Sequence, residues 1–149
     1  MEKQFNRLDE HVLGNPAGNY SQAYLDHALK PKNTGNLPGA NGFAAAEGHD
    51  GNSMEVWLKV DDDIIGQATF WTDGCGTTIA CGSMMTELAT GKNIVDALGF
   101  EPADIENALG GLPGEGCVCA GLAVSALKAA IRDYLQYKND PWKRRYRRI

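Results

Sequence analysis

The chain carries four cysteines, and three of them lie in glycine-rich segments. Cys75 stands between two glycines, and Cys117 and Cys119 end the glycine-rich stretch 110–119. Glycine lets the backbone approach a bound group closely. Thiolates are well suited to bind zinc and iron–sulfur centres. These residue types in this setting indicate a site for a metal ion or an iron–sulfur cluster.

Cys75 and Cys119 also lie close to the expected starts of two helices. The first turn of a helix has free backbone N–H groups and a positive dipole end, which lower the pKa of a thiol and favour an anionic ligand set. We therefore expect the two helix starts to converge on one metal ion or cluster. The Cys-x-Cys spacing of Cys117 and Cys119 differs from the Cys-x-x-Cys of zinc knuckles, so spacing alone does not identify the metal.

Cys81 is interpreted differently, because it falls within the apolar pattern of a helix. It precedes Met84, Met85 and Leu88 by three, four and seven residues, which places these side chains on one helix face. Free cysteine is among the residue types that are most often buried. We predict that Cys81 packs in the core, and that His27 has a structural role, either on the helix surface or in its packing.

The elements that position these residues follow from hydrophobic periodicity and turn residues. Every second residue from Met54 to Val60 is apolar, which predicts a strand that turns at 61–63 and returns over 64–72. The predicted strands are 42–46, 54–60 and 64–72, and the predicted helices are 22–29, 78–90, 94–98, 102–109 and 120–137. This order predicts an α+β fold, in which a small antiparallel three-stranded sheet packs against several helices, including a long C-terminal helix.

The composition is that of an ordinary globular protein, with 149 residues, 43% hydrophobic and 22% charged. We expect an N-terminal arm over 1–19, one domain over 20–138 and a basic tail over 139–149. Five of the 14 basic residues lie in the last seven positions, so the body is acidic, which argues against nucleic-acid binding. No apolar run reaches the roughly 18 residues of a membrane span and no apolar leader is present, so we expect a cytoplasmic protein with reduced cysteines and no membrane partner.

A series of spaced motifs extends from Tyr20 to Tyr137. The motifs are Tyr20-Ser21, Leu25-Asp26-His27, Pro31-Lys32-Asn33-Thr34-Gly35, the strand 54–60, Gly74-Cys75-Gly76-Thr77-Thr78-Ile79-Ala80, and Leu112-Pro113 with the segment 119–134. In these motifs the chain resembles the U-type iron–sulfur cluster assembly scaffolds, the IscU/NifU N-terminal family. The resemblance covers most of the chain and implies the fold of that family.

The resemblance also implies which residues form the site. The family uses three cysteines, an aspartate two residues after the first cysteine, and a histidine just before the third. Its second and third cysteines match Cys75 and Cys119. Asp50 stands where the first cysteine belongs, Asn52 where the aspartate belongs, and Val118 where the histidine belongs.

Neighbouring residues offer ligands in place of those that differ. Cys117 adds a thiolate two residues from Cys119, and Asp50 or the adjacent His49 offers an oxygen or a nitrogen. A carboxylate is a harder ligand than a thiolate. The expected ligand set is therefore Cys75, Cys117 and Cys119, completed by Asp50 or His49. The alternative for Asp50 is an ordinary exposed turn residue.

The resemblance implies a non-catalytic scaffold or carrier that binds iron, assembles a [2Fe–2S] cluster and passes it to apo iron–sulfur proteins. A cysteine desulfurase is the implied sulfur donor, with an exposed Cys119 thiolate as the expected acceptor. The family's Leu-Pro-Pro-Val-Lys chaperone motif is replaced here over 112–116, so no dedicated Hsp70-type chaperone contact is expected. The alternatives are a diverged member that binds zinc or iron or accepts persulfide sulfur for a specialised partner, and a metal-free interaction module.

Overall fold

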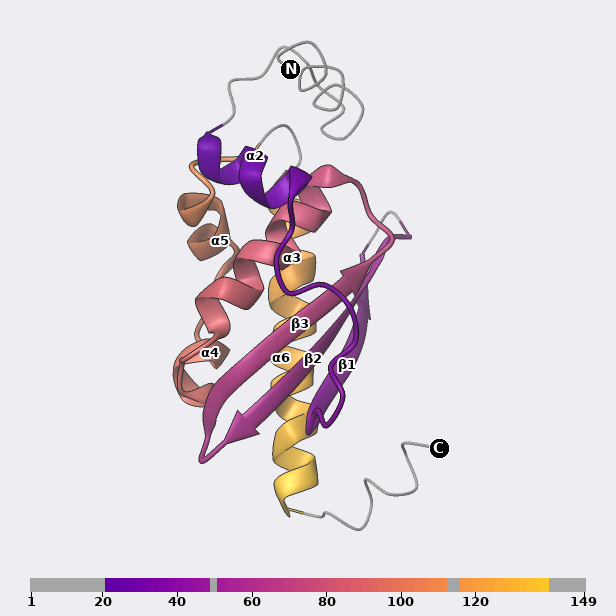
Figure 1. Cartoon of the computed structure of the whole chain (residues 1–149), viewed down its shortest axis with the longest axis vertical. Coiled ribbons are helices and arrows are strands. Elements are labelled where there is room, and N and C mark those ends of the chain that lie inside the picture. The colour runs from indigo at the N-terminus through magenta and orange to yellow at the C-terminus, as the bar shows by residue number, and fades with distance from the viewer. Residues whose placement is uncertain (1–20, 49–50, 113–115, 140–149) are drawn as a thin grey trace.

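The computed structural model describes residues 21–48, 51–112 and 116–139 (Figure 1). In chain order the elements are α2 (Gln22–Leu29), β1 (Gly42–Glu47), β2 (Ser53–Asp61), β3 (Ile64–Thr72), α3 (Gly76–Ala89), α4 (Ile94–Leu98), α5 (Pro102–Ala108) and α6 (Gly116–Asn139). The predicted α+β fold is confirmed, with its three-stranded sheet and its long C-terminal helix.

The sheet is antiparallel throughout, with β2 in the centre. The turn between β2 and β3 contains Asp62 and Asp63, both at positive φ (55° and 63°). Two consecutive left-handed residues match the twist of a tight hairpin, and aspartate tolerates this conformation better than most residues. The turn predicted at 61–63 is therefore confirmed.

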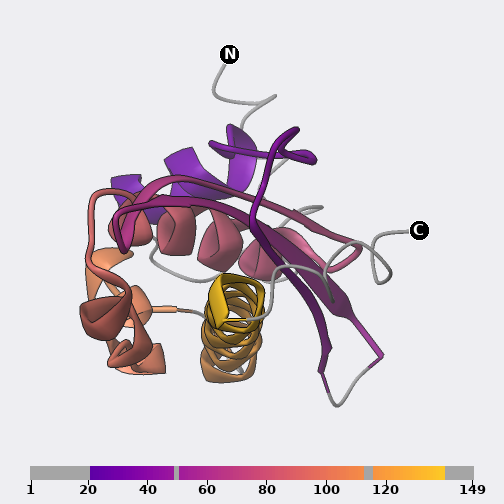
Figure 2. The same ribbon diagram turned by 90° about the horizontal axis from the view of Figure 1, so that it is seen from below.

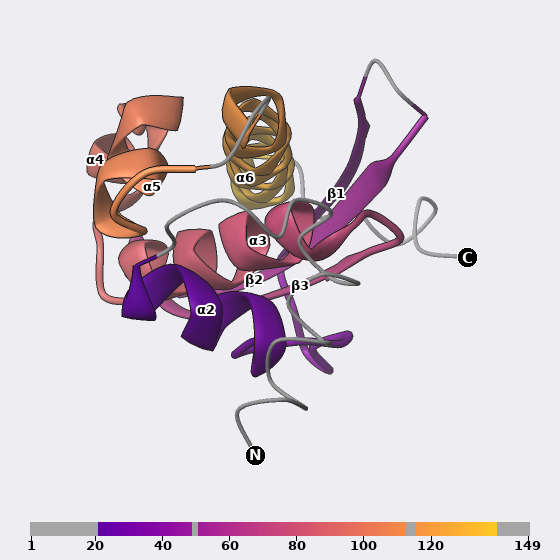
Figure 3. The same cartoon turned by 90° about the horizontal axis from the view of Figure 1, so that it is seen from above.

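Helices α3 and α6 pack on the same face of the sheet, and α2 packs on α3 (Figures 2 and 3). The other face is crossed by the chain between α2 and β1. This segment first pairs with the outer edge of β3, where Phe70 exchanges backbone hydrogen bonds with Asn33 and Gly35, both 2.9 Å long. At the opposite edge, the Phe43 N–H of β1 donates to the Asp133 carboxylate of α6 (2.9 Å).

The core lies between the sheet and the two long helices. Alternate residues of β2 are buried, as the period-2 pattern predicted. The largest fully buried side chains are Tyr24, Phe70, Met54, Leu58, Ile65, Met85, Ile105, Leu109, Leu127 and Ile131. Gly82 allows α3 to approach the sheet, because a Cβ at this position would lie 2.5 Å from the Phe70 ring.

Helix α6 begins earlier than predicted. The sequence pattern placed Cys117 and Cys119 in a loop before a helix from Ala120, whereas the helix begins at Gly116 and includes both positions. Glycine is a poor helix former, so the glycine-rich stretch before Ala120 suggested a loop, whereas its last four residues form the first turn of the helix. None of the described helices is both long enough and apolar enough to span a lipid bilayer.

Candidate functional site

Cys75 is positioned by the tight connection from β3 to α3. It is the N-cap residue of α3, with extended backbone (φ −79°, ψ −175°), and its side chain is exposed. Gly74 is required just before it, because a Cβ at this position would lie 2.7 Å from both Cβ and Oγ1 of Thr78. The Thr72 hydroxyl accepts a hydrogen bond from the Gly74 N–H (3.1 Å), which fixes the end of β3 against this connection.

Cys119 reaches the same place from the first turn of α6. The buried Thr78 hydroxyl donates a hydrogen bond to Cys119 Sγ (3.3 Å) and lies 3.8 Å from Cys75 Sγ. Because both sulfurs contact one oxygen atom, they are within reach of a single metal ion or two-iron cluster. The starts of α3 and α6 lie at the same end of the molecule, together with the end of β3 (Figures 1 and 3).

The pKa values of the two thiols are shifted in opposite directions. The Cys119 thiol donates a hydrogen bond to Cys75, which lowers the pKa of Cys75 to about 4, and the N–H groups of Thr78 and Thr77 act in the same direction. This hydrogen bond and burial raise the pKa of Cys119. Which of the two thiols accepts persulfide sulfur stays a prediction, but Cys75 rather than Cys119 is the more exposed and the more acidic of the pair. The physical reason is that Cys75 caps a helix, whereas Cys119 is half-buried.

Cys81 and His27 lie in the interior, and neither is one of the two side chains whose sulfurs contact the Thr78 hydroxyl. Cys81 is fully buried, and burial raises its pKa. His27 is 5% exposed, with Nδ1 2.6 Å from the Ser83 hydroxyl and Nε2 3.2 Å from the Glu87 carboxylate. Burial lowers the pKa of His27, so the ring is neutral at pH 7. The predicted core packing of Cys81 and the predicted structural role of His27 agree with this placement.

The remaining candidate ligands, Asp50, His49 and Cys117, have no described side chains. Asp50 and His49 lie outside the described residues, and so does the side chain of Cys117, although its backbone belongs to α6. Among the described residues, no group of three or more His, Cys, Asp or Glu side chains is arranged to hold a metal ion. Cys75 and Cys119 thus form a pair of donors that needs further ligands.

The flanks of the segment that carries Asp50 are tied to the Cys75 connection. The Ser53 N–H donates to the Asp73 carboxylate (2.8 Å), two residues before Cys75. The Thr72 hydroxyl donates to the Ser53 carbonyl (2.6 Å). These bonds hold the start of β2 beside the start of α3, so the segment 49–50 is joined to the site by only a few residues.

Sequence reasoning missed two residues of this site, Thr78 and Asp73. Thr78 had one signal in the sequence, its place three residues after Cys75 within the motif 74–80. Its partner Cys119 is 41 residues away in the sequence. Asp73 had no signal, because an aspartate between a strand and a glycine is typical of any turn.

Comparison with known proteins agrees with the fold. The family model for the NifU-like N terminal domain matches residues 19–140. The chain is 41% identical over 119 residues to the iron–sulfur cluster assembly scaffold protein IscU of Aquifex aeolicus, covering 78% of this chain and 76% of the relative. It is 37% identical over 127 residues to the protein of the same name from Rickettsia prowazekii, covering 81% and 95%.

Solved structures show the same fold at lower sequence identity. A NifU-like protein (N-terminal) from Brucella abortus has a TM-score of 0.61 at 17% identity, covering 87% of this chain and 97% of that one. A putative iron–sulfur cluster assembly scaffold protein from Fervidobacterium islandicum has a TM-score of 0.60 at 19% identity, covering 75% and 96%. With the family model and the curated relatives, these likenesses lead to one conclusion: the chain belongs to the NifU-like N-terminal domain family.

Proposed function

We propose that this protein is a scaffold on which an iron–sulfur cluster is assembled and from which it is passed to apo-proteins. The observation that carries the proposal is the convergence of Cys75 and Cys119, from two helix starts, on the hydroxyl of Thr78. Relatives that share about 40% of their residues with this chain are named as scaffolds of this kind. A site of two thiols, one of them exposed, suits a cargo that must enter and leave.

Sulfur enters through Cys75 in this proposal. The Cys75 thiolate attacks the terminal sulfur of a persulfide on a cysteine desulfurase. The sulfur–sulfur bond of the donor breaks, the donor cysteine leaves as a thiolate, and a persulfide forms on Cys75. Atoms and charge balance in this exchange, and no outside oxidant is needed. The exposure of Cys75 makes it the accessible partner for such a donor.

Cys75 and Cys119 then serve as thiolate ligands of the cargo. We propose a [2Fe–2S] cluster, with the remaining ligands drawn from Asp50, His49 and Cys117. A mixed set that includes a carboxylate binds iron less tightly than an all-thiolate set. The consequence is a cluster that transfers readily to apo iron–sulfur acceptor proteins.

The proposal also covers the setting in which the protein works. It holds cargo and catalyses no reaction itself, acts in the cytoplasm, and needs no nucleic acid and no dedicated Hsp70-type chaperone. Zinc competes for the same thiols during purification, because it prefers the same sulfur ligands.

The test is the anaerobic iron and sulfide content of the full chain after reconstitution with ferrous iron and a desulfurase. Wild type is expected to be brown, and Cys75→Ser and Cys119→Ser are expected to retain less than about a tenth of its iron. Cys81→Ala is the matched control, because Cys81 is fully buried and is not one of the two sulfurs beside the Thr78 hydroxyl. It should keep its iron but lose thermal stability.

Two outcomes would contradict the proposal. A colourless wild type with one zinc ion per chain would favour the diverged metal-binding member. A wild type that binds neither metal nor sulfide under anaerobic conditions would favour the interaction module.

A further inference from the structure

The hydroxyl of Thr78 is directed at a cysteine of another helix, whereas the threonines near it along the chain bond elsewhere. The Thr77 hydroxyl lies 2.7 Å from the Tyr24 hydroxyl of α2. Thr86 and Thr90 donate to carbonyls three and four residues earlier in the chain, at Ser83 and Thr86, both over 2.7 Å. Such local bonds are the usual solution for threonine in a helix. Thr78 instead donates to a sulfur on another helix, Cys119 Sγ at 3.3 Å.

The side chain of Thr78 is held in this direction by its surroundings. Thr78 is fully buried, and a β-branched side chain has few rotamers in a helix. Gly74 leaves the space that it fills, since a Cβ at residue 74 would lie 2.7–2.8 Å from Cβ, Oγ1 and Cγ2 of Thr78. Gly74 and Thr78, on either side of Cys75 in the sequence, therefore fit together in space.

One hydroxyl carries one proton, so Thr78 donates to one sulfur at a time. The shorter distance is to Cys119, at 3.3 Å against 3.8 Å for Cys75. Cys119 comes from α6, whereas Thr78 and Cys75 both belong to the start of α3. The hydrogen bond thus ties the cysteine of one helix to the helix that carries the other cysteine.

We propose that Thr78 is a positioning residue, whose hydroxyl holds Cys119 Sγ beside Cys75 Sγ so that both sulfurs face one incoming group. This positioning role deepens the proposed scaffold function and rests on it, because holding the two sulfurs together serves the binding of a cluster. The geometry itself is testable without any cargo. Hydrogen bonds to ligand sulfurs also tune the properties of a bound iron–sulfur centre.

The first test measures sulfur positioning with dibromobimane, which becomes fluorescent when it has joined two thiols. All variants carry Cys117→Ser, so that bridging reports on Cys75 and Cys119, since the remaining thiol, Cys81, is fully buried. Thr78→Val keeps the shape but loses the hydroxyl, and Thr78→Ser keeps the hydroxyl. We expect a two- to tenfold slower bridging rate in Thr78→Val, the range that follows from one hydrogen bond, and a near wild-type rate in Thr78→Ser.

Thr86→Val is the matched control, because it removes a buried hydroxyl from the same helix without touching either sulfur. Its bridging rate should equal that of wild type even if its melting temperature falls. Thr78→Ala is a second variant without the hydroxyl, for use if the valine is not accommodated.

The second test uses Co²⁺ binding to the reduced, metal-free full chain with Cys117 intact. Thr78→Val is expected to bind Co²⁺ about tenfold more weakly, with a changed sulfur-to-cobalt charge-transfer band, and Thr78→Ser is expected to resemble wild type. Equal bridging rates in wild type, Thr78→Val and Thr78→Ala would overturn the positioning role, and so would a wild type that does not bridge. If bridging depends on the hydroxyl while no variant takes up Co²⁺ or iron, the positioning role stands and the scaffold function fails.

Discussion

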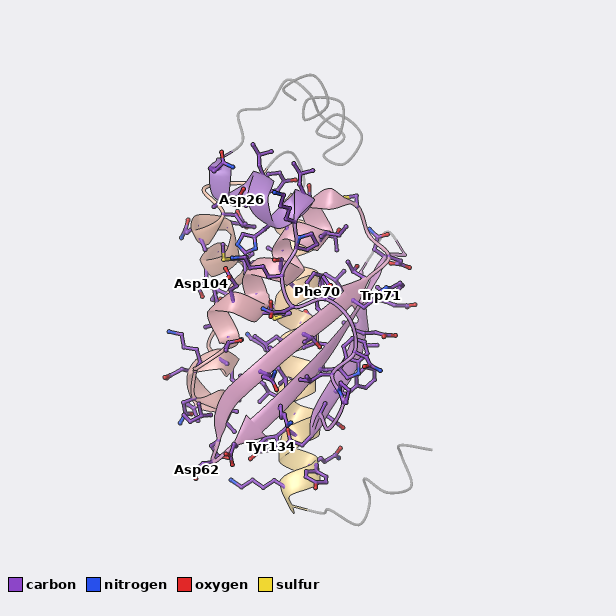
Figure 4. All side chains as sticks on the ribbon, in the orientation of Figure 1. Asp26, Asp62, Phe70, Trp71, Asp104 and Tyr134 are labelled. Carbon is purple, nitrogen blue, oxygen red and sulfur yellow. The ribbon has the colours of Figure 1, made fainter. Side chains whose placement is uncertain are left out.

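The polar groups at the two ends of α6 differ in how completely they are paired with one another. At the C-terminal end, the Asp63 carboxylate accepts hydrogen bonds from the Tyr134 hydroxyl (3.0 Å) and from Lys138 Nζ (2.9 and 3.1 Å). Figure 4 shows Tyr134 near the hairpin turn that carries Asp62. These bonds lower the pKa of Asp63, and the same ion pair raises the pKa of Lys138.

At the N-terminal end, the first turn of α6 brings Cys119 to Cys75, and this pair keeps capacity for a ligand. Asp63 accepts hydrogen bonds from an ammonium group and a hydroxyl of its own chain, whereas the sulfurs of Cys75 and Cys119 both lie beside the single hydroxyl of Thr78. The difference teaches that a polar cluster indicates a binding site when some of its groups lack a hydrogen-bond or ion-pair partner within the cluster. When every group has such a partner, the cluster indicates a structural role. Four changes test this distinction.

The largest effect is expected from replacing both thiols. The Cys75→Ser/Cys119→Ser variant should lose at least about tenfold of its reconstituted iron, because serine is a poor ligand for iron–sulfur iron. Its melting temperature should remain close to that of wild type, because the pair is only partly buried. Iron analysis and thermal unfolding on the same preparations measure both quantities, and a large loss of stability would show that the thiols are structural.

The next effect concerns the glycine before Cys75. Gly74→Ala should destabilise the protein by about 1–3 kcal/mol, the usual cost of overpacking, because the new methyl group meets Thr78. Gly121 in α6 is the matched control, with nothing within 4 Å of its added Cβ. Gly121→Ala should stabilise by about 0.5–1 kcal/mol, since alanine is the better helix former. Urea denaturation measures both, and equal effects would contradict the close fit at residue 74.

The third effect is a pH dependence that originates from His27. Its folded pKa lies below the value of 6.5 because of burial, so the unfolded chain binds the proton more tightly. The stabilisation is complete above pH 6.5 and falls as the pH drops through 6.5 toward the folded pKa, by at most about 1.4 kcal/mol per pH unit. His27→Asn should flatten this part of the curve of unfolding free energy against pH. An unchanged slope between pH 7 and 5 would show that other groups cause it.

The smallest effect is expected at the C-terminal end of α6, where Tyr134 and Lys138 bond to Asp63. Tyr134→Phe removes the hydroxyl bond to Asp63 but leaves the ion pair with Lys138, so it should cost about 1 kcal/mol of unfolding free energy. Iron uptake should not change, because this residue is far from the cysteine pair along α6. A loss of iron in this variant would mean that the two ends are coupled, which would weaken the comparison.

Local signals in the sequence were sufficient for most of the fold. The Ser21 side chain caps α2, and the predicted bounds 22–29, 64–72 and 94–98 match the observed elements. These elements depend on caps, turns and periodicity, which are contained in short stretches of chain. The start of α6 was missed because glycines near a cysteine pair suggest a loop.

The site was only partly predictable, because its geometry depends on contacts between distant segments. Residue type and helix position indicated that Cys75 and Cys119 would meet. Which thiol ionises first depends on which of the two donates the hydrogen bond between them, and the sequence contains no sign of its direction. The roles of Asp50, His49 and Cys117 remain predictions, which the reconstitution experiments address.

The pairing of Asn33 and Gly35 with Phe70 also affects how the protein behaves at high concentration. The outer edge of β3 is engaged there by the protein's own chain, and the Phe43 N–H at the outer edge of β1 is engaged by Asp133. An unpaired strand edge is a template on which a second molecule can add a strand. Phe43 and Trp71 are exposed on a β-sheet, a setting in which free edges would promote aggregation. At these positions a second copy cannot add a strand, so the fold carries aromatic residues at its surface while strand-by-strand association between copies is impeded there.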